Sequence, residues 1–189
     1  MKKLVFIALA ITSTAFGQQV IVKKDGSKLV AADVNVHSSK RQIEFKANGK
    51  EDKIAFSELD SAVIDKKVLK RFDIGNKARL YYVLASSKGK SLGVISSKRN
   101  RDRGGFSSVV TLYEVVVIEN GKILQELKFT QSKTQDEVRK RKEFYDIANR
   151  YFGDCDGFIK RLMLFDNGTD PDNLILLNYL DNPEKISCK

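Results

Sequence analysis

Three arginines spaced two residues apart are the side chains of this sequence best suited to chemistry. They follow a lysine and precede two glycines, in the order Lys98, Arg99, Arg101, Arg103 and Gly104-Gly105. Guanidinium groups bind phosphate or carboxylate oxygens through paired hydrogen bonds, and glycines let the backbone approach a ligand closely. The segment therefore predicts a polyanion-binding site. A nucleic-acid site of this kind would also need repeats and interleaved aromatic side chains, and a charged, solvated hairpin loop is the simpler interpretation.

Oxygen-bearing side chains form a second group near the C-terminus: Asp166, Asn167, Asp170, Asp172 and Asn173. Such oxygens can surround calcium, which is a hard cation. The spacing differs from that of an EF-hand loop, and the glutamate that ends such a loop is absent. The same residue types are those of an ordinary turn, so we predict no metal site here.

The sequence contains only two cysteines, Cys155 and Cys188. In an oxidising compartment they would form a disulfide that closes a loop of ~33 residues, which the chain-entropy model values at about 3.7 kcal/mol. A free, buried Cys155 beside a frayed tail is the alternative. Neither cysteine resembles a catalytic nucleophile, because the only histidine, His37, lies more than a hundred residues away.

Sequence templates of the common enzyme classes are absent. The chain has no G-x-S-x-G, no H-E-x-x-H, no phosphate-binding loop and no dinucleotide fingerprint. We therefore interpret the protein as non-enzymatic, expect no cofactor and identify no catalytic residue. A hydrolase with an unrecognised pair of carboxylates is the alternative, because acidic residues are plentiful.

The first seventeen residues have the organisation of a cleavable signal peptide. Lys2 and Lys3 precede the apolar run Leu4 to Ile11, and small residues at Ala15 and Gly17 suit a signal peptidase. The run is much shorter than the ~20 residues of a membrane span. We predict cleavage after Gly17 and a periplasmic or secreted product; a buried N-terminal helix is the alternative.

The chain is strongly basic, with 34 Lys and Arg against 24 Asp and Glu and a formal net charge of +10. Such a surface favours anionic partners, here envelope polysaccharide or lipid headgroups; another envelope protein is a further candidate. Export argues against a specific nucleic acid. Because the charge is spread along the chain, a generic basic surface is the alternative, and no segment after residue 17 has transmembrane length.

The alternation of side chains predicts an α+β fold, with antiparallel strands over the N-terminal two-thirds and two or three C-terminal helices. Residues 18–66 form short strands, with turns at Asp25-Gly26 and Asn48-Gly49 and an inward-facing row at Val30, Ala32, Val34 and Val36. Residues 67–189 form an antiparallel sheet plus the helices. Its strands are expected near 80–85, 92–95 and 109–118, and the polar stretch 98–105 ends the second of them.

The type I′ turn predicted at Asn120-Gly121 leads into a return strand with three inward side chains, Ile123, Leu127 and Phe129. A capping box from Thr134 to Glu137 then predicts a helix start. The buried stripe of that helix is expected at Val138, Tyr145, Ala148 and Phe152, with Arg139, Lys140 and Lys142 facing solvent. A second helix should run from 155 or 156 to 165, and 174–180 favours helix over strand.

The strand succession over 19–64 resembles small SH3-like or Sm-like β-barrels, and a simple meander suits the same residues. The whole chain is similar to small exported proteins of Bacteroidota-type bacteria. That resemblance is carried by three stretches: Phe16-Gly17-Gln18, the Asp25-Gly26 hairpin leading to Phe56-Ser57-Glu58-Leu59, and Tyr151-Phe152-Gly153-Asp154-Cys155. It implies no activity and no binding residues.

The sequence thus predicts an exported, non-enzymatic protein that binds an anionic envelope ligand through basic loops. A hydrolase and a structural accessory acting through protein contacts are the rival functions. A pocket with convergent Asp or Glu would favour the hydrolase, a basic groove would favour anion binding, and a large exposed apolar patch would favour a protein partner.

Overall fold

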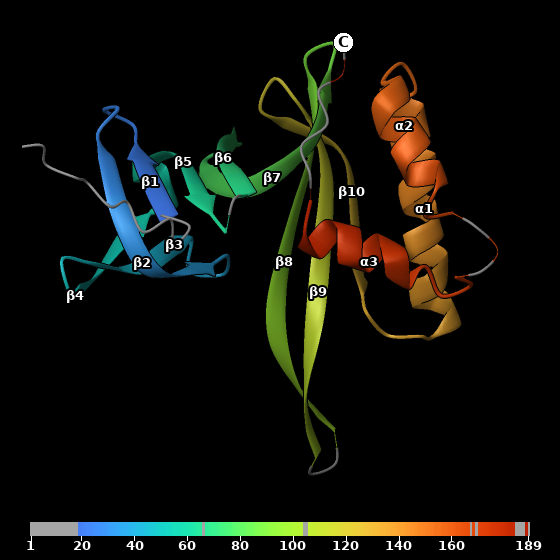
Figure 1. The fold of residues 1–189 in the computed structure, drawn as a ribbon, viewed down its shortest axis with the longest axis horizontal. Helices are drawn as coiled ribbons and strands as arrows, with labels where there is room; N and C mark the ends of the chain where they lie inside the picture. Colours follow the sequence, from blue (N-terminus) through green and yellow to red (C-terminus); the bar gives the residue numbers. More distant parts are fainter. Residues whose placement is uncertain are drawn as a thin grey trace, which may run out of the picture.

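The computed structural model describes residues 19–65, 67–103, 106–166, 168, 170–183 and 188, with the backbone alone for 99–103 and 106–107. The predicted signal peptide, residues 1–17, lies outside the described residues. Within them the chain forms ten strands followed by three α-helices, which confirms the α+β class (Figure 1). In chain order the elements are β1 (Gln19–Lys23), β2 (Lys28–His37), β3 (Gln42–Ala47), β4 (Lys50–Ala55), the 3-10 turn η1 (Phe56–Glu58), β5 (Leu59–Ile64), β6 (Lys67–Ile74), β7 (Lys77–Ser87), β8 (Lys90–Arg103), β9 (Phe106–Glu119), β10 (Lys122–Thr130), α1 (Gln135–Phe152), α2 (Asp156–Met163) and α3 (Leu174–Asp181).

All strands belong to one antiparallel sheet in the order β10-β9-β8-β7-β6-β5-β1-β2-β3-β4. The β9–β10 turn has φ of 49° at Asn120 and 72° at Gly121, the two positive values that a type I′ turn requires. The boundary predicted between 18–66 and 67–189 falls in the β5–β6 turn. The strands on either side of that turn pair with each other, with Val63 opposite Val68.

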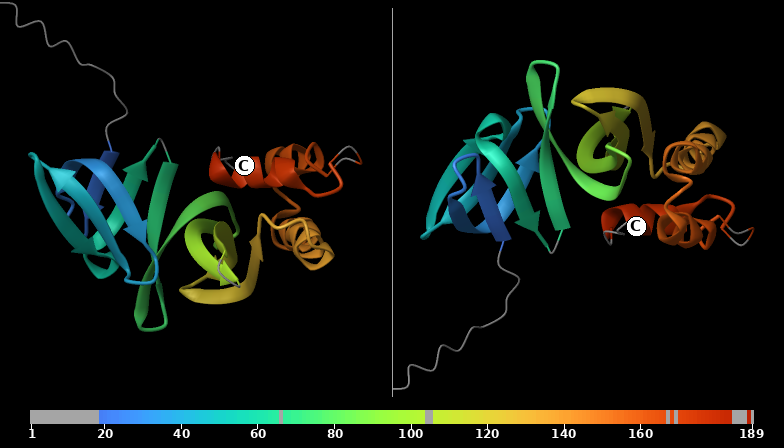
Figure 2. Two further views of the ribbon diagram at one scale, coloured as in Figure 1. Left: turned by 90° about the horizontal axis from the view of Figure 1, so that it is seen from below. Right: turned by 90° about the horizontal axis from the view of Figure 1, so that it is seen from above.

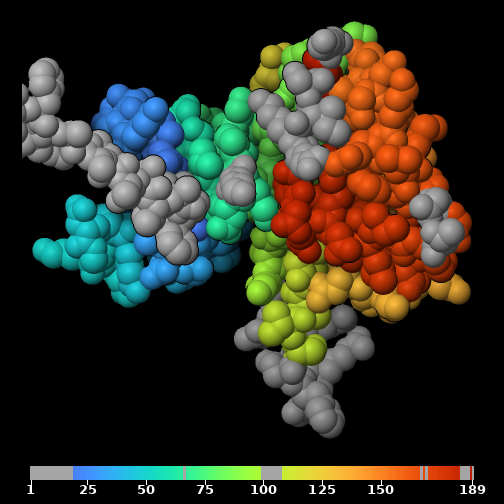
Figure 3. Space-filling model, in the orientation of Figure 1, coloured from blue at the N-terminus to red at the C-terminus, as the bar shows by residue number. Residues whose placement is uncertain are grey.

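Strands β1–β6 curl into an N-terminal lobe, and β7–β10 form a main sheet beside it (Figures 1 and 2). The lobe encloses its own core, which includes Ile21, Phe45, Phe56 and Leu59 and also takes Leu80 from β7. Figure 3 shows the lobe projecting from the part of the molecule that carries the helices.

One extra residue in β2 changes which side chains face this core. Ala32 lies opposite Lys46 and Asn35 opposite Glu44, so three steps on β2 match two on β3, with φ of 50° at the intervening Asp33. Such a bulge inverts the inward and outward alternation. Ala31 is therefore buried, whereas Val30 is 60% exposed, and the predicted inward row from Val30 to Val36 is wrong in its first half.

The helices cover one face of the main sheet, as both views in Figure 2 show. Their core joins strand side chains such as Val94, Val115 and Phe129 to Phe144 and Phe152 of α1. The opposite face carries a smaller apolar group, the cleft-side cluster: Tyr81, Ile95, Val116 and Ile118. Ile123 packs against this cluster rather than with Leu127 and Phe129 as predicted, because a register shift follows it in β10. None of the described helices combines the length and apolar character of a membrane span.

The start of α1 differs from the predicted capping box. Thr134 makes no side-chain capping hydrogen bond, and the Glu137 carboxylate accepts a hydrogen bond from the Thr130 amide instead. The helix also buries a cation that the sequence did not reveal. Arg141 has 0% exposed surface, and its guanidinium donates to three carbonyls: Asp172 at 2.8 Å, Thr130 at 2.6 Å and Ser132 at 3.0 Å. Burial lowers the pKa of Arg141.

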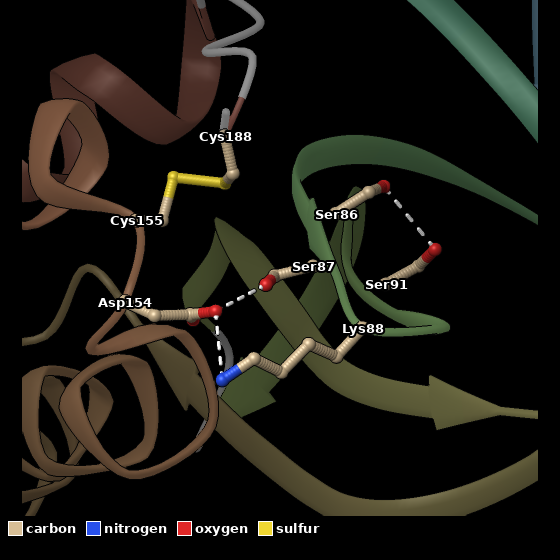
Figure 4. The surroundings of a disulfide bond; sticks show 7 residues. All are labelled: Ser86, Ser87, Lys88, Ser91, Asp154, Cys155 and Cys188. Atoms are coloured by element: carbon tan, nitrogen blue, oxygen red, sulfur yellow. Dashed lines mark hydrogen bonds and ion pairs between the residues drawn. A yellow bond between two sulfur atoms is a disulfide. The ribbon is translucent and has the colours of Figure 1, made fainter.

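A disulfide joins Cys155 to Cys188, across 33 residues of sequence, as Figure 4 shows. Cys155 is buried at the start of α2. Its neighbour Asp154 holds the β7–β8 turn, because its carboxylate accepts a hydrogen bond from Ser87 at 2.8 Å and pairs with Lys88 at 3.2 Å (Figure 4). The disulfide therefore fixes Cys188 close to the point where α1, α2 and the β7–β8 turn meet.

Candidate functional site

The arginine-rich segment of the sequence lies in a strand and not in a loop. Strand β8 continues to Arg103 and pairs with β9 along its whole length, with Lys98 opposite Thr111 and Arg103 opposite Phe106. The predicted strand end at the polar stretch 98–105 was therefore wrong. A two-stranded hairpin is only marginally stable alone, but this ribbon continues the pairing of the main sheet. Polar residues can therefore extend it, because the partner strand is rich in β-branched residues such as Val109 to Thr111.

This part of the hairpin extends beyond its neighbours (Figure 1). Strand β7 pairs with β8 only as far as Val94, and β10 pairs with β9 only from Leu112. Lys98 is exposed, while the side chains of Arg99, Arg101 and Arg103 lie outside the described residues. Polyanion binding by these four residues therefore stays a prediction.

A basic cleft lies on the face of the main sheet that the helices leave open. Its volume is about 320 Å³, and residues from the β2–β3 turn, η1 and all four strands of the main sheet line it. Four of its side chains are cationic and one is acidic. The lining residues are Ser38, Ser39, Arg41, Phe56, Lys77, Arg79, Leu80, Tyr81, Ile95, Glu114 and Lys128.

Glu114 of β9 is the centre of a hydrogen-bonded group that we call the floor of the cleft. Its carboxylate accepts a hydrogen bond from the Tyr81 hydroxyl at 2.6 Å and one from Arg79 at 3.3 Å. Lys128 approaches the other carboxylate oxygen at 3.4 Å and pairs with Glu126 at 2.8 Å. Strand register explains the grouping, because Glu114 lies directly opposite Ile95 on one side and Lys128 on the other.

The floor keeps its donors protonated. The hydrogen bond to Tyr81 and the charges of Glu114 and Glu126 raise the pKa of Arg79. Hydrogen bonding to Glu126, followed by the charge of Glu114, raises the pKa of Lys128. Burial, followed by its bond to Glu114, raises the pKa of the Tyr81 hydroxyl. The floor is thus a fixed array of donors around one carboxylate.

Arg41 and Lys77 form the rim of the cleft, and both are exposed. Among the described residues, neither side chain forms an ion pair or a side-chain hydrogen bond. The backbone at Arg41 is held by a hydrogen bond, which its carbonyl accepts from the Phe56 amide at 2.9 Å. The Ser38 hydroxyl, which also lines the cleft, is buried without a hydrogen-bond partner in the described structure.

Sequence reasoning missed this cleft, since its cations lie at positions 41, 77, 79 and 128 and no local motif joins them. The two-residue spacing of Lys77 and Arg79, and of Glu126 and Lys128, does place each pair on one face of a strand. Only the strand order brings the two faces to the same site.

A second hollow, of about 560 Å³, lies on β2–β4 and contains four acids and two lysines. Its lining residues are Asp33, Asn35, Glu44, Phe45, Lys46, Glu51, Asp52 and Lys53. Lys46 pairs with Asp33 at 2.8 Å, and His37 pairs with Glu44 at 2.9 Å. A hydrogen bond from Gln42, together with the charges of His37 and Lys40, lowers the pKa of Glu44. A general acid needs the opposite shift, so Glu44 is unsuited to that role.

The C-terminal group of oxygen-bearing side chains takes part in loop structure where it is described. Asp170 accepts a hydrogen bond from the Ile175 amide at 2.7 Å at the start of α3, and Asp172 pairs with Lys133 at 3.3 Å. Within the described ranges, no three His, Cys, Asp or Glu side chains are grouped to hold a metal ion.

The basic cleft is therefore the site in which polar side chains from distant parts of the chain converge. The exposed large apolar residues lie on several elements, and only Met163 and Leu164 are adjacent in sequence, at the end of α2: Val30, Val68, Val109, Leu124, Met163, Leu164 and Ile175. Comparisons with protein-family models, with curated proteins and with solved structures found no match for the chain.

Proposed function

We propose that this is an exported, non-enzymatic binding protein whose basic cleft holds an anionic ligand of the cell envelope. The convergence of four cations on one cleft that contains a single carboxylate is the observation that carries the proposal. Export is supported by the signal-peptide pattern of residues 1–17 and by the disulfide, since disulfides persist in oxidising compartments.

The electrostatics of the cleft favour an anion. The four cations face Glu114 and the adjacent Glu126, which leaves two positive charges in excess, those of Arg41 and Lys77. At the edge of a protein, one such charge attracts an anion 4 Å away by roughly 4 kcal/mol before desolvation is subtracted. Arg79 and Lys128 are already held in place by Tyr81, Glu114 and Glu126, so binding orders few side chains at the floor.

A long ligand would also reach the β8–β9 hairpin. Lys98, Arg99, Arg101 and Arg103 lie on the strand that passes through the cleft at Ile95, three to eight residues beyond it. We propose this segment as a second contact for a polymeric anion, in keeping with the prediction from sequence.

Binding of dextran sulfate to the chain from residue 18 onward, measured by calorimetry at low and at physiological salt, tests the proposal. Replacing both Arg41 and Lys77 by Ala should weaken binding about tenfold, because these cations have no internal partner. The matched control replaces Lys50 and Lys122, two exposed lysines outside the cleft, and should change the affinity less than twofold. Equal losses from both pairs would point to a generic basic surface and contradict the proposal, as would the absence of binding.

A further inference from the structure

The basic cleft has two parts that differ in charge compensation. On the floor, Glu114 and Glu126 pair with Arg79 and Lys128 at distances from 2.8 to 3.9 Å. On the rim, Arg41 and Lys77 have no carboxylate partner among the described residues. A ligand anion is therefore attracted to the rim far more than to the floor.

The floor is suited to hydroxyl groups. The Glu114 side chain is 21% exposed, and a carboxylate offers about four acceptor positions, of which Tyr81, Arg79 and Lys128 use three. A ligand hydroxyl can donate to the remaining position, whereas a second anion at the same place would be repelled by Glu114.

The buried hydroxyl of Ser38 also suits such a ligand. Buried polar atoms nearly always have a hydrogen-bond partner, and this one has none within the described protein although it lines the cleft. A ligand oxygen beside Arg41 would supply the partner. Ser38 and Arg41 belong to the same turn between β2 and β3.

We infer that the ligand of the basic cleft is an acidic carbohydrate, with its anionic group on Arg41 and Lys77 and its hydroxyl groups on Glu114 and Ser38. This inference rests on the proposed function and names the class of ligand. A volume of about 320 Å³ is near the lower limit of small-molecule sites, so the cleft holds one repeating unit of the chain and leaves the rest outside.

A phosphate polymer lacks the hydroxyl groups that can donate a hydrogen bond to Glu114 on the floor of the cleft. Inorganic polyphosphate carries a charge on every unit and no hydroxyl, so it places an anion against Glu114 wherever it enters the cleft. The carbohydrate should therefore bind more tightly than polyphosphate of equal charge, and Glu114 should be the residue that causes the preference.

The test compares four probes by calorimetry with the chain from residue 18 onward: hexagalacturonate, inorganic polyphosphate of equal charge, the neutral sugar maltohexaose, and vesicles containing phosphatidylglycerol. We expect hexagalacturonate to bind at least fivefold more tightly than polyphosphate, with no binding of maltohexaose or vesicles. The variant Glu114→Gln should reduce that preference to less than twofold, mainly by strengthening polyphosphate binding. Ser38→Ala should weaken hexagalacturonate alone, and circular dichroism checks that both variants are folded.

The outcomes separate the inference from the proposed function. If polyphosphate binds as tightly as hexagalacturonate, and the Arg41 and Lys77 double variant weakens both, the cleft binds anions but the carbohydrate inference is wrong. Tighter binding of vesicles would likewise overturn it in favour of a lipid headgroup. If the double variant leaves every probe unaffected, the proposed function itself fails.

Discussion

Replacing Arg141 by Met is the sharpest test of how the helices are fixed to the sheet. The guanidinium gives hydrogen bonds to three carbonyls, which belong to β10, to the segment before α1 and to the loop before α3. A hydrogen bond from a charged donor contributes about 1.5 kcal/mol, so the three together contribute about 4–5 kcal/mol.

The opposing effect comes from burial of the charge. Methionine avoids the desolvation of a guanidinium whose Nη2 lacks a partner among the described residues, and we expect about 1–2 kcal/mol to be recovered in this way. The net loss should be about 3 kcal/mol. In a domain of this size it should lower the melting temperature by about 6–12 °C.

Urea unfolding followed by circular dichroism measures this change directly. Lys142→Met is the matched control, because Lys142 follows Arg141 on the same helix, carries the same charge and is exposed. The control should alter the free energy of unfolding by less than about 0.5 kcal/mol. If Arg141→Met stays within about 1 kcal/mol of the unmodified protein, then relief of desolvation balances the hydrogen bonds and the buried cation is not what fixes the helices.

Three further predictions concern other parts of the fold. Replacing Cys155 and Cys188 by Ala should lower the free energy of unfolding by at most about 3.7 kcal/mol, measured in urea, because the open chain gains loop entropy. Gly93→Ala should lower the melting temperature clearly, since the added Cβ would lie 2.8 Å from the Cβ of Tyr81 in the closely packed cleft-side cluster. Lastly, the free energy of unfolding should fall as the pH is lowered. Burial alone would raise the pKa of Glu137, but its hydrogen bonds outweigh burial and hold that pKa below its ordinary value of 4.5 in the folded protein.

The sign of the pH effect follows from the direction of the shift. A carboxyl group with a lowered pKa stabilises the fold above its unfolded pKa, and this contribution is lost as the pH falls through the folded value. Glu137→Gln should therefore flatten the acid side of the profile of stability against pH, and an unchanged profile would contradict the assignment.

The other two predictions have their own controls. For Gly93→Ala, the control is Gly168→Ala, where an added Cβ meets nothing within 4 Å and little change in the melting temperature is expected. Reductant should act on the unmodified protein but not on the double Ala variant.

Local chemistry was enough to predict much of the fold. The Asn120-Gly121 turn could be predicted because glycine and asparagine tolerate the positive φ that the turn needs. The buried stripe of α1 at Tyr145, Ala148 and Phe152 followed from helical spacing alone, whereas Val138, predicted in the same stripe, is only half-buried. These features depend on neighbours within a few residues, and for that reason the sequence displays them.

What could not be predicted depends on distant residues. The bulge after Ala32 and the register shift after Ile123 are set by the partner strands. Each one moves the side chains on one side of it to the opposite face of the sheet. Arg141 resembled the solvated lysines around it because its carbonyl partners lie 9 to 31 positions away. The basic cleft needs four strands in one order before Arg41 and Lys128 line the same site.

Strand β7 contributes to each of the three apolar cores formed by the described residues. Leu80 lies in the core of the N-terminal lobe, Tyr81 in the cleft-side cluster, and Leu84 and Ala85 in the core beneath the helices. Loss of this one strand would expose all three cores together, so we expect the lobe and the helical part to melt in a single cooperative transition. A ligand that stiffens the cleft at Tyr81 would then slow hydrogen exchange in the distant helices as well.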